Sequence, residues 1–317
     1  MKTNSLVDNV TALKTPILFI VFNRLDTTKV VLDAIRAAKP EKLYIAADGA
    51  RKNKEGELQQ VQLVRDYVLA NINWPCEVKT LFREENLGCK YAVSTAISWF
   101  FKNEEKGIIL EDDCLPSKSF FSFCEELLFK YDSDLRIWHI GGTNFQNGQL
   151  RGDDDYYYSN YSPVWGWASW ASRWNHYDSE VADYTESKTK EILESIFVSK
   201  KQQKKWNKIF KLSYLGKIDT WDYQWIYTIF TNNGISIIPN VNLISNIGFG
   251  INATHTVDLD SKFSNLATKE LTFPLKHPKH VFVSKQADDY LERLNKISLM
   301  TYCKHMVELI TKKIKRG

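Results

Sequence analysis

The stretch that most constrains the fold of this chain is an apolar run that ends in three consecutive carboxylates. Ile108-Ile109-Leu110 is typical of a buried parallel strand, and Glu111-Asp112-Asp113 follows it directly. Pro116 then prevents the chain from continuing as a strand. Because three carboxylates at the end of a central strand repel one another, the pattern favours a hard divalent cation with phosphate ligands at that place.

The same triplet has a simpler interpretation. In a chain with 25% charged residues, a Glu-Asp-Asp sequence is common and usually marks a solvated loop or the start of a helix. Its position after an apolar strand, together with the polar residues that follow other strands, favours the cation site.

Strand and helix signals alternate from Pro16 onward. Strands are predicted at residues 17–22, 43–47, 78–82, 108–110, 137–140 and 235–238, and most of them precede a segment with one apolar helical face. Such alternation predicts an α/β fold, with a mostly parallel sheet and helices on both faces. In these folds, ligands bind beyond the carboxyl ends of the strands.

Polar side chains follow four of the predicted strands. They are Asn23 and Arg24, then Asp48, then Arg83, and finally Glu111, Asp112 and Asp113. The arginines suit phosphate groups or a base carbonyl, Asp48 can accept a hydrogen bond from a ribose or a base, and the acidic triplet can hold a metal. Each arginine alone is equally an ordinary surface residue, but the set indicates a binding site.

Residues 156–170 form the most aromatic part of the chain, and a soluble surface cannot expose them all. Trp165-Gly166-Trp167 either presents flat rings to a sugar or belongs to the core, and the sequence does not decide between the two. Trp221, farther along the chain, is assigned to the same candidate sugar platform.

A further group of candidates lies at the start of a predicted helix that ends near residues 232–234. Asp219 or Asp222 can cap this helix, and Asp222 can also be a general base in a partly apolar pocket. The glycine- and asparagine-rich residues 242–250 lead to His255 and can form a lid over a nucleotide. His255 is a candidate metal or phosphate ligand, although a lone histidine is more often structural.

Composition indicates a globular protein kept in a reducing compartment. The 317 residues suffice for one large or two ordinary domains, and 44% of them are hydrophobic. Five scattered cysteines without a C-x-x-C pair argue against both disulfides and a zinc site. Residues 1–14 are polar and show neither a signal peptide nor a membrane span, so we expect a cytoplasmic location.

The net charge of +4 is concentrated at the C-terminus. Residues 300–317 hold five basic residues and one acidic residue, so the other 299 residues balance at zero. A neutral body argues against nucleic acid as a partner. The apolar residues of the C-terminal segment share one helical face opposite its lysines, which predicts a basic amphipathic helix. This helix either packs on the body or binds the anionic inner face of the plasma membrane. The lysine-rich stretch at 185–217 is interpreted as a solvated face.

Seven short motifs carry a family resemblance. They are Phe22-Asn23-Arg24, Ala47-Asp48-Gly49, Arg83 with Asn86-Leu87-Gly88-Cys89, Leu110-Glu111-Asp112-Asp113, Trp165-Gly166-Trp167, Trp221-Asp222-Tyr223-Gln224-Trp225 and Asn246-Ile247-Gly248-Phe249-Gly250. Together they resemble a bacterial family of GT-A fold glycosyltransferases. More distantly, they are similar to the eukaryotic N-acetylglucosaminyltransferase I family, which is inverting and manganese-dependent. The resemblance spans about residues 15–256.

The resemblance implies roles for individual residues. Asp113 is implied as the direct ligand of Mn²⁺ or Mg²⁺, while Asp112 and Glu111 would contact the ribose and the sugar. Arg24 and Asp48 would hold the base of the nucleotide. Asp222 would be the catalytic base, although the eukaryotic pattern has two adjacent aspartates between its tryptophans where this chain has Asp222-Tyr223-Gln224.

We expect the following organisation of the chain, of which the resemblance covers only the two middle parts. After an N-terminal tail at 1–14, residues 15–150 would form a Rossmann-like half that binds a nucleotide-sugar. Residues 151–275 would form the acceptor-side, catalytic half of the same GT-A domain, followed by the basic helical tail at 276–317.

We therefore expect a metal-dependent, inverting glycosyltransferase of the hexosyl or N-acetylhexosaminyl type. It would move a sugar from a nucleoside-diphosphate sugar, most simply a UDP-sugar, to a hydroxyl of a glycan or lipid-linked acceptor in bacterial surface polysaccharide biosynthesis. Two alternatives remain open: a metal-dependent phosphoesterase that uses the same acidic triplet, and a non-catalytic glycan-binding protein on the same fold.

Overall fold

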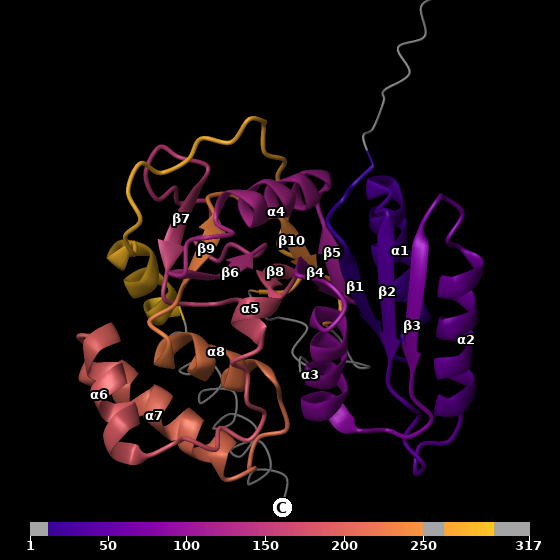
Figure 1. Cartoon of the computed structure of the whole chain (residues 1–317), viewed down its shortest axis with the longest axis horizontal. Helices are drawn as coiled ribbons and strands as arrows, with labels where there is room; N and C mark the ends of the chain where they lie inside the picture. Colours follow the sequence, from indigo (N-terminus) through magenta and orange to yellow (C-terminus); the bar gives the residue numbers. More distant parts are fainter. Residues whose placement is uncertain (1–11, 250–262, 295–317) are drawn as a thin grey trace, which may run out of the picture.

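An eight-stranded sheet runs through the computed structural model, which describes residues 12–249 and 263–294 (Figure 1). The strand order is β3-β2-β1-β4-β8-β6-β9-β7. The strands are β1 (Ile17–Val21), β2 (Lys42–Ala47), β3 (Glu77–Phe82), β4 (Lys106–Glu111), β6 (Ile137–Gly141), β7 (Tyr156–Ser159), β8 (Trp167–Trp170) and β9 (Ile235–Pro239). All six strands predicted from the sequence are confirmed.

The sheet is mostly parallel. β3, β2, β1 and β4 run in the same direction, and β6 is parallel to β9. β8 runs antiparallel to both β4 and β6, and β7 runs antiparallel to β9. Because β8 is antiparallel to both of its neighbours, those neighbours, β4 and β6, run in the same direction as each other. The residues that follow β1, β2, β3 and β4 therefore meet at one edge of the sheet.

Helices cover both faces of this sheet (Figure 1). α1 (Leu25–Ala38), α2 (Glu57–Ala70) and α4 (Lys118–Lys130) pack on one face. α3 (Gly88–Phe101), α5 (Ala171–Trp174), α6 (Glu186–Ile196), α7 (Lys200–Tyr214) and α8 (Asp222–Thr231) pack on the other. The α/β class with a Rossmann-like, mostly parallel sheet is thus confirmed, and the architecture is consistent with a GT-A fold.

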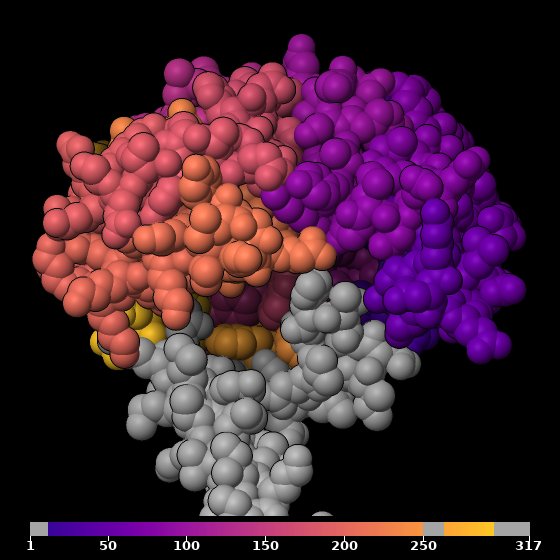
Figure 2. All heavy atoms as spheres, turned by 90° about the horizontal axis from the view of Figure 1, so that it is seen from below, coloured from indigo at the N-terminus to yellow at the C-terminus, as the bar shows by residue number. Residues whose placement is uncertain are grey.

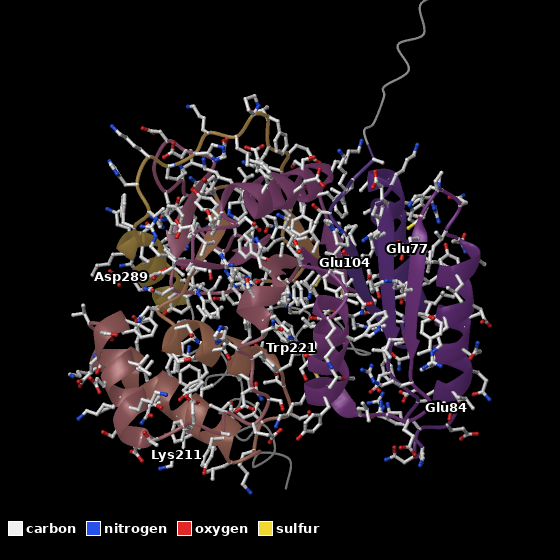
Figure 3. The ribbon with its side chains drawn as sticks, viewed as in Figure 1. Glu77, Glu84, Glu104, Lys211, Trp221 and Asp289 are labelled. Atoms are coloured by element: carbon white, nitrogen blue, oxygen red, sulfur yellow. The ribbon has the colours of Figure 1, made fainter. Side chains whose placement is uncertain are left out.

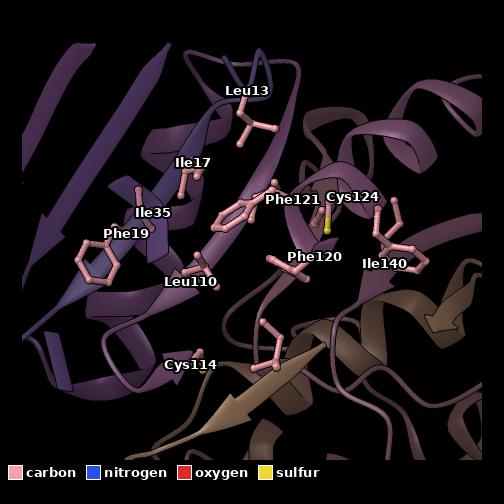
Figure 4. Packing of buried hydrophobic residues seen from close by; sticks show 14 of the residues in the cluster. Leu13, Ile17, Phe19, Ile35, Leu110, Cys114, Phe120, Phe121, Cys124 and Ile140 are labelled. Carbon is pink, nitrogen blue, oxygen red and sulfur yellow. The ribbon is translucent and has the colours of Figure 1, made fainter. Parts of the chain in front are cut away.

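Alternate residues of the strands supply two separate cores. Leu110 of β4 packs with Ile17 of β1 and with Phe120 and Phe121 of α4, as Figure 4 shows. Ile109, the residue directly before Leu110 in β4, points to the opposite face and joins the core beneath α3 and α8. A strand buried on both faces needs apolar residues at successive positions, which is why Ile108-Ile109-Leu110 lacks alternation.

The aromatic segment contains a strand that the sequence did not indicate. Trp167–Trp170 forms β8 in the interior of the sheet, where Ala168 pairs with both Ile108 of β4 and Ile140 of β6. β7 was likewise missed. Both segments are aromatic and are buried throughout, so they lack the alternation of polar and apolar residues that marks an exposed strand.

The acidic triplet lies between two strands. β4 ends at Glu111, Asp112 and Asp113 form a turn, and β5 (Cys114–Pro116) then pairs antiparallel with β10 (Ile244–Asn246). This pairing places the residues that follow β10 beside the acidic turn, and the backbone N–H of Ile247 donates to the carbonyl of Asp113 at 2.8 Å.

Two sequence predictions lie outside the described residues: His255 and the basic amphipathic helix at 299–316. Within residues 12–249 and 263–294, no helix has the length and apolar character that a membrane span requires.

Candidate active site

Arg24 binds the acidic turn that follows β4. Its Nη2 lies 3.0 Å from Oδ1 of Asp112 and 2.8 Å from Oδ2 of Asp113. Asp112 is buried, and its Oδ2 also accepts a hydrogen bond from the backbone N–H of Phe22 at 3.1 Å. The end of β1 and the end of β4 are thus joined through one guanidinium group.

The carboxylates of this turn carry more negative charge than Arg24 balances. Burial, with repulsion from Asp113, Asp112 and Asp222, raises the pKa of Glu111 to about 8. Burial also raises the pKa of Asp112 to about 6, although the guanidinium of Arg24 opposes the shift. A further cation would relieve this repulsion, and the oxygen donors present are the type that Mg²⁺ and Mn²⁺ prefer.

The residue Gly248 closes over the Arg24–Asp113 pair. Its carbonyl accepts a hydrogen bond from Nη1 of Arg24 at 3.3 Å, and its N–H donates to Oδ1 of Asn246 at 2.9 Å. A Cβ atom at position 248 would lie 2.2 Å from Oδ2 of Asp113 and 2.6 Å from Nη1 of Arg24. The same Cβ would lie 2.6 Å from Cβ of Asp113, which cannot swing away as the ends of the two side chains can, so a larger residue at 248 would force the acidic turn and this backbone apart.

Asp222 reaches the same region from the other half of the sheet. It is the first residue of α8 and accepts a hydrogen bond from the hydroxyl of Thr220. Its charge contributes to the raised pKa of Glu111, and burial with four carboxylates, those of Glu111, Asp219, Asp222 and Asp48, raises the pKa of Cys89 to about 12. Residues far apart in the sequence thus surround the beginning of α3, and Cys89, which the sequence placed in a motif without a role, lies among them.

Two of these carboxylates hold the first turn of α3. Asp48 accepts hydrogen bonds from the N–H groups of Leu87 and Gly88 at 3.0 and 3.1 Å and from Nδ2 of Asn86 at 2.9 Å. Asp219 accepts from the N–H of Lys90 at 3.1 Å. Both therefore satisfy amide groups that a helix start leaves without partners, and Asp219 caps α3 instead of α8.

Two further candidates have protein partners of their own. Nδ2 of Asn23 donates to Oε1 of Glu57 at 3.0 Å, and Nη2 of Arg83 donates to Oγ1 of Thr95 at 2.7 Å. Glu57 is buried and also holds Arg51 in an ion pair, which lowers the pKa of Glu57. Asn23 and Arg83 thus lie at the predicted strand ends, while the Arg51–Glu57 pair had no signal in the sequence because its acidic member lies within α2.

Two members of the predicted sugar platform belong to the core. The rings of Trp167 and Trp221 stack with centroids 5.7 Å apart, and they are 0% and 3% exposed. A buried ring has no face for a sugar, so the prediction of an exposed platform is corrected at these two residues. Trp221 lies near the middle of the molecule beside α3 (Figure 3), and the pair instead fixes the beginning of α8.

Trp165 differs from these two tryptophans. It is half-buried and contacts the rings of Phe145 and Phe249 at centroid distances of 5.4 and 5.7 Å. Phe145 in turn lines a cavity of about 370 Å³ together with Phe263 and Asn147. Trp165 therefore connects the loop over the acidic turn, which includes Phe249, with the wall of a cavity.

Known proteins resemble this chain weakly. No protein-family model matches it, and no curated protein matches its sequence. Solved structures with a similar arrangement include S. aureus TarS, at 12% identity and a TM-score of 0.36 over 52% of this chain and 30% of that chain. A UDP-glucose pyrophosphorylase complexed with UDP-glucose matches at 11% identity and a TM-score of 0.31, over 51% of this chain and 78% of that chain.

HddC from Yersinia pseudotuberculosis matches similarly, at 9% identity and a TM-score of 0.32, over 51% of this chain and 80% of that chain. Each similarity covers about half of this chain, and this chain spans less than a third of the TarS chain. At such low identities and TM-scores, these similarities do not indicate a function.

The described residues do not build a complete metal cage. In the ranges 12–249 and 263–294, no group of three or more histidine, cysteine or carboxylate side chains converges to hold an ion. The excess negative charge and the oxygen donors of the acidic turn nevertheless suit a divalent cation that takes its remaining ligands from phosphate and water. Figure 2 shows a hollow between the indigo and purple N-terminal part and the orange segment around α8.

Proposed function

We propose that this chain is a glycosyltransferase that takes a sugar from a nucleoside-diphosphate sugar and transfers it, with inversion, to a hydroxyl of a glycan or lipid-linked acceptor. One observation carries the proposal. Asp222, the first residue of α8, contributes to the raised pKa of Glu111, after burial and the charges of Asp113 and Asp112, so its carboxylate lies on the same side of the sheet as the acidic turn. An acidic turn that suits a cation and a separate carboxylate near it would serve a donor diphosphate and an acceptor hydroxyl, respectively.

The donor side is assigned to the acidic turn. Asp113, with Asp112 and Glu111 beside it, would hold Mn²⁺ or Mg²⁺, and His255 is a further candidate ligand outside the described residues. When bound, the cation would neutralise the charge that develops on the departing diphosphate. Arg24 would have to share or leave Asp113, since its guanidinium lies 2.8 Å from the same carboxylate.

The acceptor side is assigned to Asp222. Its carboxylate would take the proton from the acceptor hydroxyl while that oxygen forms a bond to the anomeric carbon. The bond from the anomeric carbon to the diphosphate oxygen breaks, and its electron pair leaves with the nucleoside diphosphate. Asp222 is held in place because the preceding residue, Trp221, is stacked in the core and its carbonyl accepts a hydrogen bond from the hydroxyl of Tyr177 at 3.1 Å.

The proposal is tested by ligand-dependent melting of the full chain. UDP, GDP and dTDP are each added at about 100 times their dissociation constant, once with Mn²⁺ and once with EDTA. A ligand that binds only the folded state then stabilises it by about 2.7 kcal/mol, which corresponds to a rise in Tm of about 5 °C. We expect this rise for one nucleotide with Mn²⁺ and a much smaller one with EDTA.

Other outcomes point to the rival functions. Release of phosphate from a simple ester such as p-nitrophenyl phosphate, without stabilisation by any nucleoside diphosphate, supports a phosphoesterase. Binding of glycans that responds neither to EDTA nor to nucleotide supports a non-catalytic glycan-binding protein. Either result contradicts the proposed transfer reaction.

A further inference from the structure

Helix α7 and the turn after it carry an unusual concentration of one charge. Residues 200–217 contain seven lysines, no arginine and no acidic residue. The net charge of the whole chain is +4, so the rest of the chain is on balance acidic. The lysines of this segment therefore form a positive region on a protein that is otherwise slightly negative.

The lysines of α7 differ in their surroundings according to the face of the helix on which they lie. Lys201, Lys204 and Lys208 recur every three or four residues and are exposed, whereas Trp206 and Phe210 point into the core. Lys211 and Lys200 pair with Glu186 and Glu194 of α6. No ion pair joins Lys201, Lys204 or Lys208 to a residue in the described part of the chain.

Exposed apolar side chains flank this row of lysines at both ends of the helix. Val198, just before α7, is 84% exposed, and Leu215, just after it, is 51% exposed. Tyr214 is 46% exposed and stacks on Tyr184. Leu215 continues the spacing of Lys201, Lys204 and Lys208, so that one side of the helix offers positive charge followed by an aliphatic group, with Tyr214 beside it.

We propose that this face of α7, defined by Lys201, Lys204, Lys208 and Leu215, docks the protein onto an anionic lipid bilayer. Lysine ammonium groups act as point charges that attract a diffuse layer of lipid phosphates, and exposed aliphatic and tyrosine side chains suit the interface below them. Bidentate contacts to carboxylates or to base edges favour arginine, which is absent from residues 200–217.

The position of α7 gives this surface a consequence. Lys211 of α7 lies at the lower edge of the molecule in Figure 3, and Figure 2 looks at that edge from below. The same view shows the hollow beside the α8 segment. A bilayer against α7 would therefore lie on the side where the hollow opens. The proposal does not depend on the glycosyltransferase assignment, since a protein of any function can dock in this way.

The test measures binding of the full chain to large unilamellar vesicles by co-sedimentation in 0.1 M NaCl. Vesicles of phosphatidylcholine are compared with vesicles that contain 30% phosphatidylglycerol. The test variant is Lys201→Glu/Lys204→Glu/Lys208→Glu. The matched control is Lys29→Glu/Lys102→Glu/Lys279→Glu, which makes the same change of charge at three exposed lysines elsewhere. Both variants retain the basic residues 300–317.

We expect the test variant to bind the anionic vesicles at least about 100-fold less tightly than the unmodified chain, from roughly fivefold for each lysine near the surface. The control variant should stay within about threefold. Leu215→Ser, which leaves the charge unchanged, should also weaken binding, and 0.5 M NaCl should weaken binding of the unmodified chain. Equal loss in the test and control variants would show attraction by net charge alone and would overturn the proposal.

Two further results would also contradict it. One is vesicle binding by the test variant that equals that of the unmodified chain. The other is tighter binding of a 20-nucleotide RNA than of anionic vesicles, lost in the test variant, which would assign α7 to nucleic acid. If the test variant does not fold, judged by its melting curve, the corresponding Lys→Gln triple variant decides the same question.

Discussion

Arg24 and Asp113 form an ion pair, 2.8 Å from Nη2 to Oδ2, beneath the backbone of Gly248. The pair joins the ends of β1 and β4, and Nη2 also lies 3.0 Å from Asp112. Arg24 thus occupies one side of the carboxylate to which the bound cation is assigned. Its guanidinium stabilises the acidic turn by pairing with Asp112 and Asp113, and it competes with any cation that approaches Asp113.

This competition predicts that Arg24→Gln binds Mn²⁺ more tightly than the unmodified protein. Loss of the guanidinium removes repulsion of a divalent ion at a distance of a few ångströms, and we expect an affinity about 10-fold higher for Mn²⁺ alone, measured by titration calorimetry. The same change should lower the free energy of unfolding by about 2 kcal/mol, because Asp112 stays buried without its partner.

The matched control for this experiment is Arg36→Gln. Arg36 pairs with Asp33 on the surface of α1, at 2.6 Å. We expect less than about 0.5 kcal/mol of destabilisation and an unchanged Mn²⁺ affinity. An Arg24→Gln variant with weakened Mn²⁺ binding would show that Arg24 supports the ion site instead of competing for it.

Asp113→Asn keeps the shape of the side chain and removes the charge assigned to the metal. We expect the nucleoside diphosphate that stabilises the unmodified protein with Mn²⁺ to lose that effect, and glycosyl transfer to fall by at least about 10³-fold. Asp132→Asn, at the surface ion pair with Lys106, is the control and should change neither. A persistent Mn²⁺-dependent shift in Tm would place the cation elsewhere.

Asp222→Asn separates chemistry from donor binding. Without a base, transfer should fall by about 10²–10⁴-fold, while the Tm shift caused by Mn²⁺ and nucleotide should stay within about 1 °C of that of the unmodified protein. The amide can still accept the hydrogen bond from Thr220, so the start of α8 should remain folded. Full turnover in this variant would remove Asp222 from the mechanism.

The burial of His139 predicts that the free energy of unfolding falls as the pH is lowered. Its ring is buried in β6 against Trp167; Nε2 lies 2.9 Å from the carbonyl of Pro163, and Nδ1 accepts from the indole N–H of Trp225 at 3.3 Å. Burial lowers the pKa of His139 from 6.5 to about 4. The unfolded chain therefore takes up a proton near pH 6.5 and the folded chain only near pH 4, so lowering the pH through this window favours unfolding.

The size of this effect is about 3 kcal/mol between pH 7 and pH 4. We expect His139→Gln, which cannot take up a proton, to be less stable at pH 7 but to lose about 3 kcal/mol less on acidification. Denaturant unfolding of both proteins at several pH values measures this difference. Parallel pH profiles for the two proteins would contradict the assignment of the acid sensitivity to His139.

The sequence predicted the fold well where local pattern decides it. The six predicted strands were found within two residues of their expected ends, and four of them, β1 to β4, lead through short connections into a helix with an apolar face or, for β4, into β5 and then α4. β8 was not predicted because Trp167–Trp170 is buried on both sides and so carries no polar alternation. The interior position of β8 explains why Trp167 is core and Trp165 is not.

The candidate site was predicted in part. The prediction that strand ends converge agrees with the contact of Arg24 with the acidic turn and of Asp48 with the start of α3. What the sequence did not show is that these residues would bind one another: Arg24 with Asp113, Asp48 with Leu87, and Asp219 with Lys90. Residue type indicates what a side chain is able to bind, but not which partner lies within 3 Å of it.

The sequence by itself determined the alternation of strands and helices, the end of β4 in three carboxylates and the row of lysines on α7. These features depend only on residues close together in the sequence. Within such a short segment the backbone conformation alone sets how the side chains are spaced. Tertiary structure decided that Arg24 neutralises part of the acidic turn and that Gly248 lies over the pair. Those contacts join segments about 90 to 220 residues apart, so they exist only once the sheet has brought the ends of its strands to one edge.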